Sequence, residues 1–388
     1  MQEKLLYVCK SNPFFTHGGA AIRNKAIIYL LSKKYDVHLA CFSSSDQDHI
    51  DAEKKIYSIK SNPDLFSGLL SERSLSVARF YSVAMTRLMR RLVRANAFAV
   101  AYVSELAMFQ YAKHCVSEHP TKIVLDCHNI ESALLREGIP YQSWWYKCVF
   151  GLEYYPLSLF EGEALRKSDL IVFVSDDDKK TAIERHGGIK KTLVIPNCLE
   201  VALLNQTSEY KTGPTSKLDR FAIVGTLDWH ANRIGITWFI HTIWNKYASA
   251  NRDAELHLIG KQYRTTNDFA GRGIVQHRNV GDVGQLLSSV DVCLAPLLYG
   301  GGTRLKILEY FYRRKPVIAT SKAAHGLELT PGIHYLRADN YREFERAVQD
   351  LTDVDLRSRL IENGHELLLR KYDIDLYEDI LLTTLLRL

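Results

Sequence analysis

The chain alternates short apolar runs with longer amphipathic segments. Runs typical of buried strands lie at residues 5–9, 37–42, 100–104, 122–126, 170–174 and 193–195. The segments between them have helical period, as at 20–31, where Ile22, Ala26 and Leu30 share one side. Strands separated by helices predict an α/β domain with a doubly wound, Rossmann-like parallel sheet.

The alternation lapses at residues 205–218, which are polar and contain Gly213 and Pro214. A second alternating block follows, with strand-like runs at 221–225, 256–259, 290–295 and 317–320, and the chain is helical by period from Tyr341 onward. We therefore expect a domain at 1–205, a linker at 206–218, a second Rossmann-like domain at 219–371, and a helix near 372–388 that packs back on the first domain. Ligands of such sheets bind beyond the carboxyl ends of the strands, which places the expected site in the cleft that the domains face.

Composition is that of an ordinary soluble globular protein. The chain has 388 residues, 46% of them hydrophobic and 24% charged, and a net charge of +6, too modest to suggest a nucleic-acid role. We find neither a leader peptide nor an apolar run of the roughly 18–20 residues that a membrane span needs. The seven cysteines are scattered, without a Cys-x-x-Cys pair, which favours the reducing cytoplasm.

A glycine loop between two strand-like runs carries the clearest candidate chemistry. The loop glycines leave room for a ligand to approach the backbone, and Thr303 is expected to cap the helix that follows. A helix start attracts anions, Arg304 and Lys306 add two cations, and Glu309 lies one turn beyond Lys306. The segment fits a nucleotide-sugar site, although a glycine turn before an ordinary amphipathic helix remains an alternative. Its residues are Gly300, Gly301, Gly302, Thr303, Arg304, Lys306 and Glu309.

This segment resembles the donor-binding element of family 4 glycosyltransferases, the retaining "glycosyl transferases group 1" enzymes. The resemblance extends through Lys315-Pro316-Val317-Ile318-Ala319-Thr320 and is strong over 221–328, moderate over 1–42 and 121–200, and weak over 43–120. It implies a GT-B fold, a UDP- or GDP-sugar donor, transfer with retention and no metal or other cofactor.

The resemblance also implies roles for individual residues. Glu309 would bind the ribose, and Arg304, Lys306 and the loop amides would neutralise the departing diphosphate. Gly301 stands where many members carry the first of two paired glutamates, so the usual carboxylate contact to the donor hexose is missing.

Residues 225–232 resemble a further family signature at the start of the second domain. Gly225, Thr226 and Asn232 could meet the phosphates there. Thr226 and Asn232 occupy positions at which many members carry an arginine and a lysine, so Arg304 and Lys306 are the expected phosphate cations.

The first domain supplies the other candidates. His17, Gly18 and Gly19 follow the first strand and resemble the family's N-terminal glycine loop, with Arg23 and Asn24 just beyond; a plain strand-to-helix turn is the alternative. Histidine at 128 matches a family histidine that faces the donor sugar, although a histidine bonded to nearby backbone is also compatible. Asp126 and Glu131 flank it, and Glu131 fits a first helical turn.

Two aspartate patterns invite comparison with metal-binding glycosyltransferases. Asp176-Asp177-Asp178 and Asp46-Gln47-Asp48 both follow strand-like runs. Ser175 with Asp178 is better interpreted as a helix capping box, and no metal is expected.

Two segments suggest a membrane partner. Residues 80–94 combine four arginines with apolar residues, and 144–160 are rich in aromatics, so both could contact an anionic membrane peripherally. We therefore expect a cytoplasmic enzyme that transfers sugar to a growing glycan or polyprenyl-linked acceptor in bacterial surface polysaccharide synthesis. The alternatives are a catalytically inactive, partner-binding subunit and a GT-B nucleotide-sugar epimerase or phosphorylase.

Overall fold

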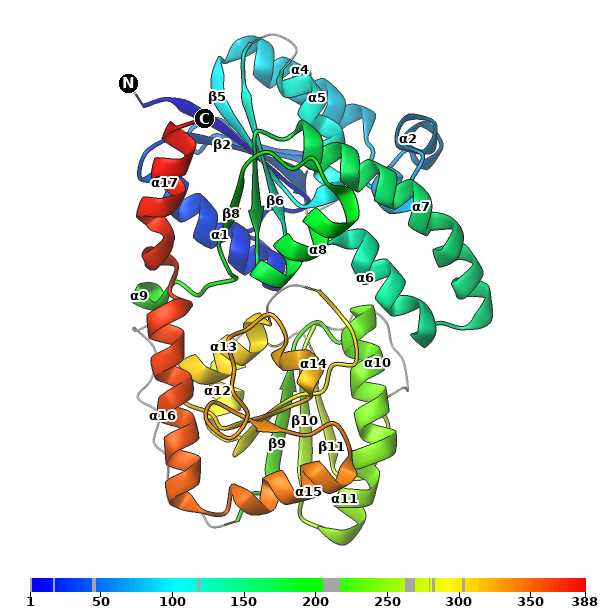
Figure 1. Ribbon diagram of the computed structural model, residues 1–388, viewed down its shortest axis with the longest axis vertical. Helices are drawn as coiled ribbons and strands as arrows, with labels where there is room; N and C mark the ends of the chain where they lie inside the picture. Colours follow the sequence, from blue (N-terminus) through cyan, green and yellow to red (C-terminus); the bar gives the residue numbers. More distant parts are fainter. Residues whose placement is uncertain are drawn as a thin grey trace. The chain divides into compact units, whose positions relative to one another are not determined.

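The computed structural model describes residues 2–16, 18–43, 47–116, 119–204, 217–261, 269–278, 280, 283–301 and 304–388. The chain divides into two units: unit 1 is Met1–Cys198 with Ile374–Leu388, and unit 2 is Leu199–Asp373. The C-terminal segment therefore belongs to the unit in which the chain begins (Figure 1). The expected linker at 206–218 lies mostly outside the described residues.

Unit 1 contains an eight-stranded sheet in the order β3-β4-β2-β1-β5-β6-β7-β8. Neighbouring strands are parallel except β3 and β4, an edge pair that the apolar pattern does not predict because β3 is short and exposed. The strands are β1 (Lys4–Cys9), β2 (Asp36–Ser43), β3 (His49–Asp51), β4 (Ile56–Lys60), β5 (Phe98–Ser104), β6 (Lys122–Cys127), β7 (Leu170–Phe173) and β8 (Thr192–Val194).

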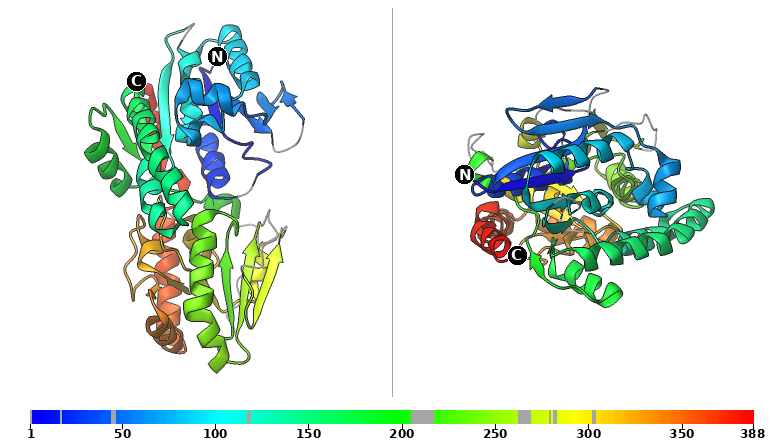
Figure 2. Two further views of the ribbon diagram at one scale, coloured as in Figure 1. Left: turned by 90° about the vertical axis from the view of Figure 1, so that its right-hand side faces the viewer. Right: turned by 90° about the horizontal axis from the view of Figure 1, so that it is seen from above.

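Helices cover both faces of this sheet, because successive strand residues point to opposite sides. On one side Leu6 belongs to the same core as Met89 of α4. On the other side Tyr7 belongs to the same core as Ile27 of α1 and Leu385 of α17 (Figures 1 and 2). The helices are α1 (Gly19–Ser32), α2 (Leu65–Glu72), α3 (Leu75–Ala78), α4 (Val83–Ala95), α5 (Ala112–Cys115), α6 (Glu131–Gly138), α7 (Trp144–Lys167), α8 (Asp176–His186) and α17 (Glu378–Leu386), with 3-10 turns at Leu106–Tyr111, Ile139–Tyr141 and Ile374–Tyr377.

Unit 2 contains a six-stranded parallel sheet in the order β11-β10-β9-β12-β13-β14. Its strands are β9 (Arg220–Val224), β10 (Glu255–Gly260), β11 (Ile274–Arg278), β12 (Val292–Ala295), β13 (Val317–Ala319) and β14 (Leu336–Arg337). Its helices are α9 (Val201–Leu204), α10 (His230–Phe239), α11 (Asn245–Ala250), α12 (Val283–Ser288), α13 (Leu305–Tyr312), α14 (Ser321–Ala324), α15 (Tyr341–Asp350) and α16 (Val354–Lys371), with a π-helical segment at Ile240–Trp244.

The α/β class with two largely parallel sheets is confirmed. Ser175 caps the start of α8, because its Oγ accepts a hydrogen bond of 3.1 Å from the Asp178 amide, and the same hydroxyl donates to Asp178 Oδ2 at 2.6 Å. Within the described part of the chain, none of the helices is long and apolar enough to cross a membrane.

Each sheet reverses its strand order at its first strand. In unit 1, β1 lies between β2 and β5, and in unit 2, β9 lies between β10 and β12. The loops that follow the two central strands at such a point run to opposite faces of the sheet and leave room for a ligand. The residues just beyond β1 and β5, and just beyond β9 and β12, are therefore the ones to inspect for chemistry.

Candidate functional site

The loop after β1 ends in a glycine that begins the first helix. Gly18 has a φ of 118°, a value that favours glycine, and precedes Gly19, the first residue of α1. No side chain caps this helix start among the described residues. His17 lies outside the described residues.

A buried ion pair lies under the strand ends of unit 1. Arg23 Nη2 is 2.6 Å from Asp126 Oδ1, and the side chains are 2% and 0% exposed. Arg23 Nε donates to the same carboxylate. Burial by itself raises the pKa of Asp126, but the charge of Arg23, together with the nearby His128 ring, outweighs it and lowers that pKa to about 2. Asp126 is therefore a permanent carboxylate, not a proton carrier.

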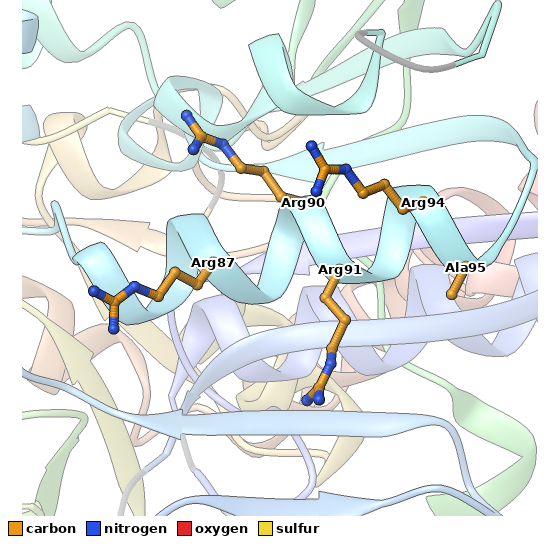
Figure 3. A pocket seen from close by; sticks show the side chains of 5 residues that line it. All are labelled: Arg87, Arg90, Arg91, Arg94 and Ala95. Atoms are coloured by element: carbon orange, nitrogen blue, oxygen red, sulfur yellow. The ribbon is translucent and has the colours of Figure 1, made fainter.

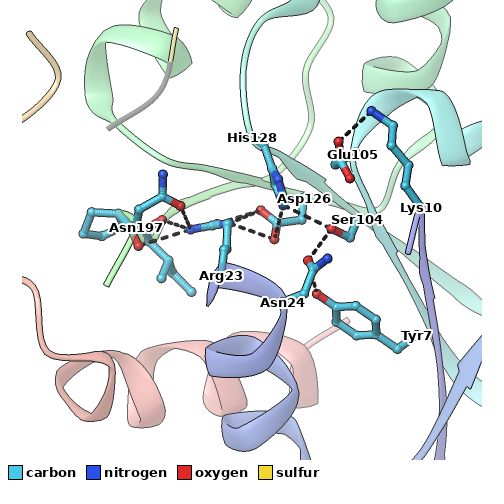
Figure 4. Close-up of polar contacts among 11 residues, drawn as sticks. Tyr7, Lys10, Arg23, Asn24, Ser104, Glu105, Asp126, His128 and Asn197 are labelled. Atoms are coloured by element: carbon cyan, nitrogen blue, oxygen red, sulfur yellow. Dashed lines mark hydrogen bonds and ion pairs between the residues drawn. The ribbon is translucent and has the colours of Figure 1, made fainter. Parts of the chain in front are cut away.

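The same arginine also contacts the segment that leaves unit 1. Its Nη1 donates to the carbonyl oxygens of Ile195 and Pro196, at 2.9 Å and 3.1 Å, and to Asn197 Oδ1 at 3.4 Å. Unit 1 ends at Cys198 in this part of the chain. Arg23 therefore connects the end of β6 to residues 195–197, just before the chain leaves unit 1 (Figure 4).

His128 lies just beyond β6 and belongs to the same polar network. Its Nε2 is 3.1 Å from Ser104 Oγ and 3.6 Å from Asp126 Oδ2. Ser104 donates its one proton to Asn24 Oδ1 at 2.6 Å. The Tyr7 hydroxyl donates to the same oxygen at 2.9 Å. Because the serine proton is already used, His128 Nε2 donates to Ser104, and this fixes the proton on that nitrogen. The histidine is one-tenth exposed, and Ser104 contributes to its orientation.

An ion pair that the sequence analysis did not predict joins the ends of β1 and β5. Lys10 Nζ is 2.6 Å from Glu105 Oε2, and the two side chains are partly exposed. Glu105 has a φ of 71°, an uncommon conformation for a residue other than glycine. Both residues come directly after strands that meet at the reversal point, so their position after a strand was the available signal.

The start of α6 explains the place of Glu131. The Glu131 and Ser132 amides donate to the buried Glu161 carboxylate of α7, at 2.6 Å and 3.3 Å. Glu131 lies in the first turn, as expected, and burial raises the pKa of its own carboxyl group. Glu161 supplies the cap, which the sequence analysis missed because the two residues are distant in the chain.

In unit 2, four of the expected donor residues lie together at the end of β9. Lys306 Nζ donates to Asn232 Oδ1 at 2.8 Å, and Asn232 Nδ2 donates to the Thr226 carbonyl at 2.8 Å. Gly225 has a φ of 148°, and a Cβ there would lie 3.1 Å from Asn232 Nδ2 and 3.5 Å from Lys306 Nζ. The glycine therefore leaves room for the lysine over the strand end.

The pKa of Lys306 is strongly lowered by its surroundings. Burial, together with the nearby charge of Arg304, lowers the pKa of this lysine to about 7, and Glu309 only partly opposes the shift. A bound diphosphate would favour the protonated form, so the site is arranged to gain its full positive charge when an anion arrives.

Arg304 organises the glycine loop. It occupies the N-cap position of α13, whereas Thr303, the expected cap, lies outside the described residues. Arg304 is buried, and its guanidinium donates to the carbonyl oxygens of Gly300, at 2.6 Å, and Gly301. These bonds hold the loop closed on its own arginine. Gly302 and Thr303 lie outside the described residues.

Glu309 lies in the second turn of α13 and is half-buried. Burial raises the pKa of its carboxyl group, against the opposing charges of Arg313 and Lys306. In the described part of the chain no hydrogen bond reaches this carboxylate, so it is available to the hydroxyls of a ligand.

A tyrosine separates β9 from β12 at the reversal point. The two strands pair through Phe221 and Ala222 of β9. Beyond that point Tyr310 OH accepts from the Val224 amide at 2.9 Å and donates to the Leu294 carbonyl at 3.3 Å. This bridge satisfies backbone groups that the diverging strands leave unpaired, and so allows the strand ends to open.

Metal-binding groups are not apparent. Among the described residues, no cluster of three or more His, Cys, Asp or Glu side chains could hold an ion. Asp176, Asp177 and Asp178 form the first turn of α8, and Asp46 lies outside the described residues.

The two Rossmann-like units define a GT-B fold, the fold of the glycosyltransferase structures that this chain resembles. Residues 219–353, within unit 2, match the family model described as "Glycosyl transferases group 1". Among curated proteins, no sequence matches the chain.

Three solved structures illustrate the similarity. Sucrose-phosphate synthase from Thermosynechococcus elongatus has a TM-score of 0.73 at 14% identity, covering 100% of this chain and 98% of that chain. HepE from Anabaena, in complex with UDP and glucose, has a TM-score of 0.68 at 14% identity, with 100% of both chains covered. A trehalose 6-phosphate synthase from Burkholderia multivorans has a TM-score of 0.64 at 13% identity, covering 99% and 96%. At these identities the similarity shows the fold.

Proposed function

We propose that this protein is a retaining, metal-independent glycosyltransferase of family 4 that uses a nucleotide-diphospho-sugar. One observation carries the proposal: Lys306, held by Asn232 over Gly225, and the Glu309 carboxylate lie one helical turn apart on α13. A cation and an acceptor at that spacing suit a diphosphate and a ribose. The family match over residues 219–353 and the UDP complex of HepE support the same donor class.

In this mechanism unit 2 stabilises the leaving group. As the bond from the sugar to the diphosphate breaks, negative charge develops on the phosphate, and Lys306 is placed to meet it. Arg304 contributes by holding the loop of Gly300 and Gly301 in shape. With these cations in place the departing phosphate needs no metal, and we expect EDTA to leave the transfer rate unchanged.

The resemblance implies front-face attack, in which the leaving phosphate takes the proton of the acceptor hydroxyl. His128 would contact a sugar hydroxyl, with its Nε2 held by Ser104. No step then requires a protein nucleophile. Asp126, held as a carboxylate by Arg23, would serve only to orient the histidine.

The acceptor is proposed to be a growing glycan or a lipid-linked sugar of a surface polysaccharide. Phe14 and Phe15, in the loop between β1 and Gly18, are exposed. Exposed aromatic rings beside a glycine loop suit the apolar face of a sugar or the start of a lipid chain. This placement favours a carbohydrate or lipid-linked acceptor over a small phosphorylated one.

Calorimetric titration with UDP and GDP tests the donor site. We expect binding to one of them that Glu309→Ala removes, whereas Glu366→Ala, which removes an exposed carboxylate of α16, leaves it intact. Binding that Glu309→Ala leaves unchanged would contradict the proposed donor site. Incubation of the bound donor sugar with lipid-linked acceptor, followed by NMR of the anomeric proton, then distinguishes transfer with retention from inversion and from epimerisation.

A further inference from the structure

Unit 1 carries a large apolar surface on the first half of α7. The second half of this helix is packed, with Leu157 and Phe160 in the core, whereas Trp145 is 66% exposed and Leu152 is 79% exposed. Figures 1 and 2 show this first half extending away from the sheet. The large apolar side chains exposed along the helix are Trp144, Trp145, Tyr146, Val149, Leu152, Tyr155 and Leu159.

This surface continues onto α2 through α3. Phe66 and Leu70 of α2 are exposed. Glu153 of α7 accepts hydrogen bonds from Ser74 Oγ at 2.6 Å and from the Leu75 amide at 2.9 Å. Because α3 also packs against α2, the buried carboxylate fixes both apolar surfaces in one rigid part of unit 1.

A cationic surface lies next to them on α4. Its apolar side chains, including Met85 and Leu92, are buried in the core, so α4 cannot lay an apolar face on a membrane as the sequence pattern suggested. Its outer face is an open groove of about 490 Å³ (Figure 3). The residues that line this groove are Arg87, Arg90, Arg91, Arg94 and Ala95.

The two surfaces are connected through α5. Lys113 of α5 hydrogen-bonds to Ser71 and Glu72 of α2, and α5 packs against α4. Burial lowers the pKa of His114 on α5, and the charge of Arg90 lowers it further. The side chains of Arg90 and His114 are therefore close. The arginines and the apolar side chains therefore belong to neighbouring helices.

The described carboxylates near α2 and α3 have partners of their own. Asp64 caps α2 through Ser67, Glu72 pairs with Lys113, and Glu153 is buried against α3. Residues 61–96 contain six arginines and only these first two acids. A surface that joins tryptophan, tyrosine and leucine to arginine matches the interface of a bilayer, where rings enter the headgroup region and cations meet lipid phosphates.

We propose that unit 1 binds the surface of an anionic membrane, with the first half of α7 and α2 inserted into the interface and the α4 arginines on the headgroups. The first half of α7 stands away from the sheet (Figure 2), and the combination of its exposed rings with the α4 arginines suits a phospholipid surface. The inference does not require the proposed enzymatic activity, because the binding is measured without donor or acceptor.

Co-sedimentation with phosphatidylcholine vesicles that contain increasing phosphatidylglycerol tests the proposal. We expect binding that rises with anionic lipid and falls about fivefold for each arginine removed. The test variant combines Arg87→Gln, Arg90→Gln, Arg91→Gln and Arg94→Gln. Its matched control removes four exposed arginines of unit 2, by Arg342→Gln, Arg346→Gln, Arg359→Gln and Arg370→Gln.

The apolar contribution has its own test. Trp144→Ser with Trp145→Ser and Leu152→Ser should abolish sedimentation, whereas Ile333→Ser with Leu369→Ser, which removes exposed apolar groups of unit 2, should not. Brominated lipids should quench the fluorescence of the wild type and much less that of the α7 variant.

Several outcomes would overturn the proposal. These are a wild-type chain that stays in solution with anionic vesicles, an arginine variant that binds like its control, or an α7 variant that binds unchanged. If the α7 substitutions instead dissociate a dimer in analytical ultracentrifugation, the surface serves a second copy of this chain. Circular dichroism of each variant establishes that it is folded.

Discussion

The two units treat charge differently at their strand ends. In unit 1 the charged groups satisfy one another: Arg23 binds Asp126, and Lys10 binds Glu105. In the described part of unit 2, the Lys306 amine donates its hydrogen bond to the neutral side-chain amide of Asn232, and burial shifts the pKa of both Lys306 and Glu309 toward the neutral form. Paired charges orient neighbouring groups, whereas incompletely compensated charges gain free energy when a ligand arrives. The contrast suggests that unit 1 positions groups and unit 2 binds the charged part of the donor.

The largest effect that tests this contrast is expected from the removal of Arg23. Arg23→Ala leaves the Asp126 carboxylate buried without its partner, so we expect the free energy of unfolding of unit 1 to fall by about 3–5 kcal/mol. Lys33→Ala, which breaks an exposed ion pair with Glu378 in the same unit, should cost at most about 1 kcal/mol. Denaturant titration gives both free energies of unfolding. Equal losses would mean that the buried pair contributes no more than the exposed pair.

Loss of the lysine should separate binding from stability. Lys306→Met removes a charge-assisted contact to the diphosphate, so we expect the nucleotide affinity to weaken by roughly 1.5–3 kcal/mol. The fold should not weaken, because the variant no longer buries an amine. Calorimetric titration and thermal unfolding measure the two effects. An unchanged affinity would place the diphosphate elsewhere.

Much of this architecture was predictable, because apolar runs and helical period are local signals. The strands other than β3, β4, β11 and β14 follow from them, as does the order of strand, glycine loop, helix and strand around α13. The position of Lys306 over Gly225 was not predictable, because it depends on a contact between residues far apart in the chain. The cap that Glu161 provides to α6 and the ion pair of Lys10 with Glu105 were not predictable either, because both join residues far apart in the chain.

Some sequence patterns are compatible with more than one structure. The basic segment at 80–94 is amphipathic whether its apolar side faces a membrane or a core, and only the packing of Met85 and Met89 decides for the core. Thr303 was expected to cap the helix after the glycine loop because threonine is a good cap, but the bond from Arg304 to the Gly300 carbonyl was not expected. A guanidinium that reaches backward to carbonyl oxygens has no local sequence signal.

The protonation of the Lys306 amine gives a smaller effect, a change of up to about tenfold in nucleotide affinity per pH unit. Since its pKa is about 7 without ligand and rises when an anion binds, nucleotide binding takes up a proton and weakens as the pH increases above 7. Titrations between pH 6 and 9, in buffers of different ionisation enthalpy, count that proton. Lys306→Met should remove the uptake.

The same lysine makes an opposite contribution to stability. Between its lowered pKa and its usual value of about 10.5, the unfolded chain binds more protons than the folded chain, so this group makes folding more favourable as the pH rises. Wild type and Lys306→Met should therefore differ in the pH dependence of unfolding over that window. Parallel curves would show that the amine is solvated in the folded protein.

The smallest expected effect concerns the orientation of His128. Ser104→Ala removes the acceptor of the Nε2 proton, worth about 1 kcal/mol, while the nearby Asp126 carboxylate can still hold the ring. We expect a severalfold loss in kcat with the nucleotide affinity of unit 2 unchanged, since no donor-binding residue of unit 2 is altered. Ser104→Thr, which keeps the hydroxyl, should recover part of the rate. A loss of nucleotide affinity in Ser104→Ala would mean that the polar network of unit 1 also shapes the diphosphate site, and the division of labour between the units would have to be given up.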